Sequence, residues 1–134
     1  MPRPEPPLPQ LNHTPPRAFG WLDARLLHEG WLARLGPDAV AVLALLAIAA
    51  DRRGSSFFGR ARMSAALSLS RERVDLALAR LLELRLVVHR PWRTRHPDGV
   101  WQLLPLPSEP PVGDRTRGAV RLSDVVDELR RRLT

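Results

Sequence analysis

The sequence predicts a mainly α-helical domain that carries a small β-hairpin. Three features between residues 60 and 104 lead to this fold class: apolar residues at helical spacing, a short turn before them, and a hairpin pattern after them. Apolar side chains three and four residues apart form one stripe on a helix, which turns by about 100° per residue. β-Branched and apolar runs on both sides of a turn indicate paired strands. The predicted order is short helix, turn, longer helix, hairpin.

The longer helix, predicted over residues 70–84, has the clearest pattern. Its apolar stripe consists of Val74, Ala77, Leu78, Leu81 and Leu82. Ser70 stands at the N-cap, where a hydroxyl accepts a hydrogen bond from a backbone N–H one turn later. A shorter helix containing residues 64–67 precedes it, and the intervening LSLS is long enough only for a turn. Two helices joined by such a turn are the helix-turn-helix signature.

A hairpin follows the longer helix directly. Val87 and Val88 begin the first strand, and residues 100–106 supply the second. Between them, Pro97-Asp98-Gly99 has turn chemistry, because proline sets φ and glycine accepts a positive φ. Cationic side chains lie at or near the tip: Arg90, Arg93, Arg95 and His96. Packing does not require so many cations at a hairpin tip, whereas contact with a phosphate backbone does.

Residues 19–107 resemble the winged helix-turn-helix domains of bacterial regulators and plasmid replication initiators. The matching residues are Leu67, Ser68, Leu69, Ser70, Val74, Leu78, Leu81, Leu82, Leu86 and Val87. Where that pattern usually has a glycine before the Leu-Val pair, this chain has Arg85, and a left-handed arginine is only mildly strained. The resemblance implies that residues 70–84 enter the major groove of DNA and that the wing, residues 90–99, lies on the phosphate backbone.

The composition excludes cysteine-based sites and favours a polyanionic partner. The chain has no cysteine, which excludes disulfides and thiolate metal sites and is compatible with a cytoplasmic, nucleoid-associated protein. All 21 Lys+Arg residues are arginine, for which codon bias in a GC-rich genome is the simplest explanation. The net charge is +7, and residues 51–98 carry eleven arginines against five acidic residues. Positive charge concentrated on one segment is typical of nucleic-acid binders.

The rest of the chain divides into recognisable segments. Residues 1–18 hold seven prolines and are expected to be an extended or disordered leader, either inert or a ligand for a protein partner. Apolar residues from 21 to 35 indicate one helix or, because of Gly30, two short ones. A core helix is predicted from Pro37 to Ala50; its twelve-residue apolar run is too short to cross a membrane. Residues 55–59 are expected to supply a short first strand.

The C-terminal segment predicts a separate amphipathic helix. Residues 108–119 form a proline-rich, polar linker, and residues 120–134 follow with Ser123 as a cap. The apolar stripe consists of Leu122, Val125, Val126, Leu129 and Leu133. A helix this short is marginal alone in water, so its stripe is expected to pack, either on its own domain or in a homodimer that binds a palindromic DNA site.

Rotation away from the buried stripe identifies the side chains expected to meet DNA. The candidates for reading base edges are Arg71, Arg73, Leu76 and Arg80. The candidates for contacting phosphate are Arg60, Arg62, Ser70, Arg93, Arg95 and His96. This assignment follows from the geometry of helix-turn-helix proteins, in which the N-terminal part of the second helix meets the bases. For each arginine the alternative is a solvated helix face.

Other chemistry finds little support in the sequence. The four histidines show no metal-ligand spacing, no glycine-rich phosphate loop is present, and no enzymatic activity or cofactor is expected. The predicted function is a sequence-specific double-stranded-DNA-binding protein, a transcriptional regulator or a plasmid replication or partition factor. A winged helix used only as a protein–protein adaptor is the alternative of another class. An RNA-binding winged helix ranks last, because Trp92 alone suggests an exposed aromatic for base stacking.

Overall fold

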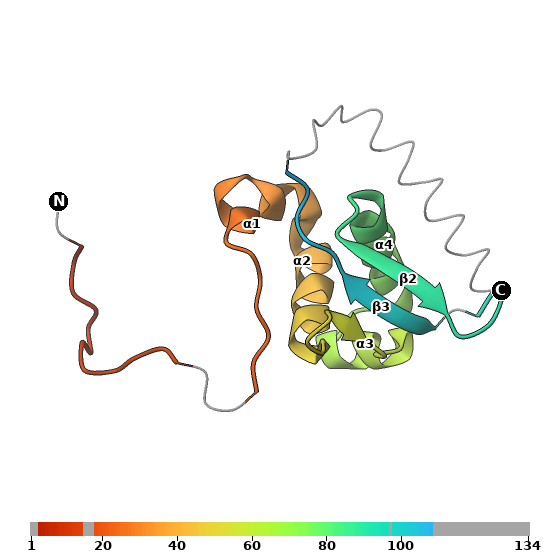
Figure 1. The fold of residues 1–134 in the computed structure, drawn as a ribbon, viewed down its shortest axis with the longest axis horizontal. Helices are drawn as coiled ribbons and strands as arrows, with labels where there is room; N and C mark the ends of the chain where they lie inside the picture. Colours follow the sequence, from red (N-terminus) through yellow and green to blue (C-terminus); the bar gives the residue numbers. More distant parts are fainter. Residues whose placement is uncertain (1–2, 15–17, 97, 109–134) are drawn as a thin grey trace.

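The computed structural model describes residues 3–14, 18–96 and 98–108, and within them it has four helices and a three-stranded antiparallel sheet (Figure 1). The elements are α1 (Arg25–His28), α2 (Trp31–Ala49), β1 (Ser55–Ser56), α3 (Arg60–Leu67), α4 (Arg71–Glu83), β2 (Val87–Pro91) and β3 (Gly99–Leu103). The fold is therefore mixed α and β. The predicted helix at residues 120–134, and all of the linker after Ser108, lie outside the described residues.

The sheet brings together strands from two parts of the chain. Its order is β1-β3-β2, so β1 adds to the outer edge of the hairpin that β2 and β3 form. Ser56 pairs with Trp101 on β3, which confirms the short strand expected within residues 55–59. On the other side Trp101 pairs with His89, and their rings stack with centroids 4.1 Å apart. The buried Trp101 thus anchors the sheet against the helices.

Helix α2 is the centre of the core and packs mainly against α4. Its buried residues are Trp31, Leu35, Ala39, Val42, Leu43, Leu46 and Ala47. Gly36 interrupts it with φ 80° and ψ 165°, so the second helical piece begins at Pro37, as the sequence predicts. By length and composition α2 could span a membrane, since it is longer than the twelve-residue run counted from the sequence. Its break and its packing against α4 are features of a core helix.

Local signals in the sequence correctly located α3 and α4. Residues 64–67 belong to α3, which begins earlier, at Arg60. The predicted stripe of α4 is buried at Val74, Ala77, Leu78 and Leu81, while Leu82 is half-buried. Ser70 caps α4 by accepting a hydrogen bond from the backbone N–H of Arg73 over 3.1 Å. These outcomes follow from nearest-neighbour chemistry, which depends little on the rest of the fold.

The end of α4 has the conformation expected of the glycine that it lacks. Arg85 has φ 59°. Its N–H donates to the carbonyl of Leu82, and the N–H of Leu86 donates to the carbonyl of Leu81. This pair of hydrogen bonds defines a Schellman motif, which satisfies the last carbonyls of the helix. It also aims the chain directly into β2, so that the hairpin begins next to the helix pair.

Residues 18–23 cross over the C-terminal end of α2. Residues 3–14 form no helix or strand and are exposed. Gly20 lies so close to α2 that an added Cβ would stand 2.7 Å from the Cα of Ile48. The first helix begins only at Arg25, and Gly30 in the left-handed conformation separates it from α2, which makes two helices of the apolar pattern. Trp21, expected in that pattern, precedes α1 and is exposed.

Candidate nucleic-acid interface

Helix α4 exposes only its N-terminal half. Its exposed residues are Arg71, Glu72, Arg73 and Leu76, and the helix is largely buried from Ala77 onward. The Arg71 side chain has no hydrogen bond or ion pair with another described residue, and it is exposed in the first turn of α4. Leu76 is 39% exposed, so it remains available for an apolar contact outside the domain. Of the four candidates for base reading, Arg71 and Leu76 therefore lie open on the helix.

Arg73 is instead held by a carboxylate on α2. Its Nε donates to Asp38 Oδ2 over 2.8 Å, and its Nη2 donates to Asp38 Oδ1 over 2.6 Å. The hydrogen bonds from Arg73 lower the pKa of Asp38 below its ordinary value, and those to Asp38 raise the pKa of Arg73. The Arg73 side chain is still 55% exposed, so this pair lies at the surface. The guanidinium is directed toward α2, where Asp38 occupies two of its five N–H donors.

Arg80 is also tied to α2. Its Nη2 and Nε donate to the carbonyl oxygen of Arg34 over 3.0 and 3.3 Å, and its Nη1 donates to Glu83 over 3.3 Å. The helix break at Gly36 and Pro37 deprives the Arg34 carbonyl of its usual partner four residues later. Arg80 supplies that missing donor. Two of the predicted base readers thus bind on either side of the α2 break, which holds α4 against α2.

Arg60, expected to contact phosphate, is buried in an internal ion network. Its Nη1 donates to Asp75 Oδ1 on α4 over 2.8 Å, and its Nε lies 3.7 Å from Asp98 Oδ1 in the wing. Its backbone N–H donates to the same Asp98 oxygen over 3.0 Å. The residue is 7% exposed, so it offers no surface to a phosphate group. It connects α3, α4 and the wing, and thereby fixes the wing relative to the helix pair.

Four of the other five phosphate candidates are exposed at the surface, and the fifth, His96, is half-buried. Arg93 and Arg95 are exposed in the wing loop, with Arg90 exposed on β2 just before them. Arg62 is exposed on α3, where its guanidinium lies 4.3 Å above the Phe58 ring. Ser70 is exposed at the start of α4, although its oxygen already caps the helix. These side chains belong to the three elements that Arg60 connects.

His96 has a structural contact within the wing loop. Its Nδ1 accepts a hydrogen bond from the backbone N–H of Asp98 over 3.1 Å, and its ring is half-buried. The backbone N–H of Trp92 donates to the Asp98 carbonyl over 3.1 Å, which closes the loop. His96 therefore shapes the tip that presents Arg93 and Arg95, and its other ring nitrogen is the one left to face outward contacts.

Two exposed aromatic rings meet beside the wing. Phe57, in the connection from β1 to α3, stacks on Trp92 with centroids 5.8 Å apart and an interplanar angle of 4°. Both rings remain more than half exposed, at 63% and 53%. Sequence reasoning had noted Trp92 alone. It missed Phe57 because the two residues are far apart along the chain and meet only through the pairing of β1 with the hairpin.

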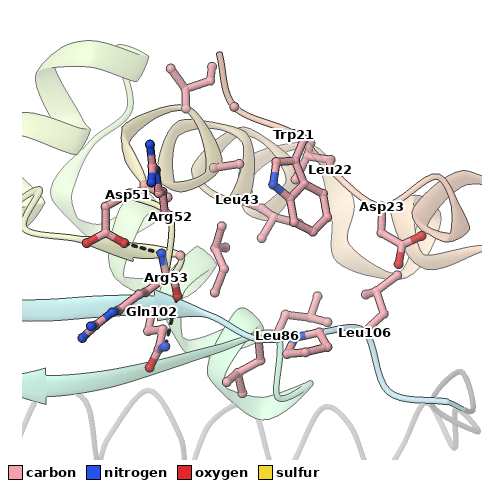
Figure 2. Close-up of a pocket in the computed structure, with 18 of the residues that line it drawn as sticks. Trp21, Leu22, Asp23, Leu43, Asp51, Arg52, Arg53, Leu86, Gln102 and Leu106 are labelled. Carbon is pink, nitrogen blue, oxygen red and sulfur yellow. Dashed lines mark hydrogen bonds between the residues drawn. The ribbon is translucent and has the colours of Figure 1, made fainter. Parts of the chain in front are cut away.

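An apolar groove of about 1000 Å³ lies away from the wing, between residues 18–23, the C-terminal half of α2 and the end of β3 (Figure 2). Figure 2 shows Trp21 and Leu22 on the side of Leu43, with Leu86 and Leu106 opposite them. At one end the chain is held by hydrogen bonds: the N–H of Arg53 donates to Asp51, and Gln102 donates to the Arg53 carbonyl. The sequence did not predict this groove, because it depends on how residues 18–23 cross α2.

Among residues 3–14, 18–96 and 98–108, no group of three or more His, Asp or Glu side chains is placed to hold a metal ion. The arrangement that the structure does provide is a set of exposed arginines on α3, α4 and the hairpin, next to a stacked aromatic pair. No family model, no curated protein and no solved structure matches the chain, so these comparisons assign it to no family.

Proposed function

We propose that this protein binds double-stranded DNA in a sequence-specific manner through a winged helix-turn-helix, as a transcriptional regulator does. In this proposal α3 and α4 are the helix pair, the N-terminal half of α4 enters the major groove, and the β2–β3 hairpin is the wing. The observation that carries the proposal is a set of exposed arginines, on the three elements that Arg60 ties together, with no acidic partner among the described residues. They are Arg62, Arg71, Arg90, Arg93 and Arg95.

Charge supports a polyanionic ligand. Residues 51–98 contain eleven arginines and five acidic residues. Arg60, Arg73 and Arg80 have carboxylate partners, and the other arginines of the segment are exposed. Phosphates bound along such a surface would release condensed counterions, which is the main source of affinity for DNA. An unneutralised cluster of this size is costly to maintain unless an anion binds it.

Arg71 is the strongest candidate for reading a base, because it is open on the first turn of α4. A guanidinium in this position can bind the O6 and N7 acceptors of guanine with two hydrogen bonds. Arg73 is a weaker candidate, because two of its five N–H donors already bind Asp38 and only the remaining three can face a guanine edge. Leu76, one turn beyond Glu72, offers an apolar contact for a thymine methyl group.

The exposed face of α4 also argues against an adaptor that binds only proteins. Such an adaptor would present an apolar face over residues 70–84, whereas the exposed residues there are mostly charged, with Leu76 as the exposed leucine. A plasmid replication or partition factor would use the same surface as a transcriptional regulator. The contacts described above apply equally to either role.

Selection of bound sequences from a random duplex pool, with the full chain as bait, tests the proposal. We expect a preferred sequence to emerge. Fluorescence anisotropy on that duplex and on a scrambled one then separates the roles: Arg71→Ala should lose about 1–3 kcal/mol of discrimination, whereas Arg95→Ala should weaken both duplexes equally. Arg52→Ala, an exposed arginine beside the groove, is the matched control and should change neither. No enrichment and no binding at low salt would contradict the proposal.

A further inference from the structure

The contacts proposed for duplex DNA leave one exposed surface beside the wing unassigned, the stacked pair of Phe57 and Trp92. The rings are almost parallel, with centroids 5.8 Å apart, and yet both stay more than half exposed. Water-exposed aromatic surface is costly, and burying one such ring stabilises a complex by a large amount. Elsewhere on the sheet, Trp101 is buried against the core, so the exposure of Trp92 is a property of its place at the start of the wing loop.

The fold itself holds the Phe57–Trp92 pair in place, without a ligand. The N–H of Trp92 donates to the Asp98 carbonyl, and the Asp98 carboxylate accepts from the backbone N–H of Arg60. Phe57 follows β1, whose Ser56 pairs with Trp101. Both rings are therefore fixed to the same sheet and to the start of α3, and a ligand that stacks on them incurs little cost for ordering the site.

The surroundings of the pair decide between possible occupants. An apolar protein segment would be expected to meet a neutral or mixed rim, but three of the exposed side chains near Trp92 in the sequence are the cations Arg90, Arg93 and Arg95. Arg62 lies over the ring of Phe58, the residue that follows Phe57 along the chain. Aromatic rings among arginines match a ligand that carries both flat rings and negative charge, which describes a nucleotide.

We propose that Phe57 and Trp92 form a stacking platform for an unpaired base, so that the preferred ligand is a duplex with a single-stranded flank or a locally opened step. This inference rests on the proposed function and specifies the kind of DNA that it needs. Within a closed duplex each base is already stacked on its neighbours and cannot offer a free face to the platform. An unpaired nucleotide next to the bound duplex can do so while its phosphates contact the wing arginines.

The test compares two forms of one duplex of the preferred sequence: blunt, and extended by a tail of about six thymidines on either strand. Stacking on an aromatic side chain contributes about 1–3 kcal/mol per base, so the tail on the correct strand should raise affinity about 5- to 160-fold. Phe57→Ala and Trp92→Ala should abolish this gain while affinity for the blunt duplex is kept. Trp92→Phe, which retains a ring, should keep part of it.

Trp21→Ala is the matched control, because Trp21 is exposed, at 75%, but lies at the groove and not at the wing. It should leave the gain intact. Tryptophan emission gives a second readout: Trp31 and Trp101 are buried, so in the Trp21→Phe background quenching by the tailed duplex reports on Trp92. Equal affinities for blunt and tailed duplexes, or a gain that survives the double variant Phe57→Ala/Trp92→Ala, would overturn the inference. Binding to the tail strand but to no duplex would instead refute the proposed function and leave the platform standing.

Discussion

Arg60 and Asp75 form an ion pair of 2.8 Å between α3 and α4, in which both side chains are largely buried, at 8% and 16% exposure. Asp98 of the wing adds a second carboxylate 3.7 Å from the same guanidinium. Removing one partner of a buried pair leaves an uncompensated charge, which makes such pairs costly to break. The position of the wing relative to the helix pair therefore depends on Arg60.

The first prediction concerns Arg60 and Arg62, which are neighbours on α3 with opposite environments. Arg60→Ala should lower the free energy of unfolding by about 3–5 kcal/mol, because it strands Asp75. Arg62→Ala, at an exposed position, should change it by less than about 0.5 kcal/mol but weaken DNA binding. Urea denaturation of the two variants measures both changes in the free energy of unfolding. Equal losses of stability, or a neutral Arg60→Ala, would show that the buried ion pair between α3 and α4 does not stabilise the fold.

The second prediction is a pH dependence that comes from Asp38. Its pKa is lower in the folded protein than in the unfolded chain, because Arg73 donates two hydrogen bonds to the carboxylate. The pair should therefore stabilise the fold above the ordinary carboxyl pKa of about 4, and this contribution should vanish as the pH falls through the lowered value. Asp38→Asn should be less stable than the unmodified chain at neutral pH and equally stable in acid.

Asp23 adds its own acid-dependent contribution, since the backbone N–H of Arg25, followed by its side chain, lowers the pKa of Asp23. Urea denaturation should therefore measure the free energy of unfolding of Asp38→Asn and of the unmodified chain at each pH. The contribution of Asp23 is the same in both proteins, so it cancels in the difference between them. A difference that persists below the lowered pKa would mean that Asp38 acts through something other than Arg73.

The third prediction follows from the left-handed Arg85. An L-residue with a side chain pays about 1–2 kcal/mol in this conformation, and glycine loses about 0.5–1 kcal/mol through its freer unfolded chain. Arg85→Gly should therefore stabilise the protein by about 0.5–1 kcal/mol. Arg85→Ala keeps the strain and should bring no such gain. If thermal unfolding gives alanine and glycine the same effect, the Schellman motif at this position is not strained.

The fourth prediction concerns the crossing of the N-terminal segment over α2. A Cβ at position 20 would stand 2.7 Å from the Cα of Ile48 and closer still to the carbonyl oxygen of Ala47. Both contacts are with backbone, so Gly20→Ala should push the segment away and cost about 1–3 kcal/mol. Hydrogen exchange should show faster opening of the C-terminal half of α2, with duplex binding unchanged. Unaltered exchange there would contradict the close packing.

What the sequence could predict, and what it could not, depended on the range of the interaction. The Ser70 cap, the α4 stripe and the left-handed Arg85 rest on residues within about two helical turns, and the hairpin pairs two strands that are consecutive in the sequence. The partners of Arg73 and Arg80 on α2 lie 35 and 46 residues away, on either side of the α2 break. The spacing of apolar residues predicts which face of a helix is buried. The rotamer of an arginine on the other face depends on which hydrogen-bond acceptor the fold places near it.

The same limit explains the remaining site residues. Arg60 was expected at the surface, but the fold surrounds it with Asp75 and Asp98, which are 15 and 38 residues away. The arginines that stayed exposed, such as Arg62 and Arg71, are those for which no acceptor comes near within the described part of the chain. Whether the segment at 120–134 forms the predicted dimer remains a prediction; sedimentation of the full chain and of a version ending at Pro111 distinguishes a dimer from a monomer.

The salt dependence of duplex binding tests the central claim most directly. Anisotropy titrations of the preferred duplex with the full chain, between about 50 and 200 mM salt, yield the slope of log affinity against log salt concentration. Phosphate contacts by Arg62, Arg90, Arg93 and Arg95 predict a slope of about −3 to −4. Arg95→Ala should make it shallower by about one unit. A flat response, or no binding at the lowest salt concentration, would contradict the assignment of this surface to DNA.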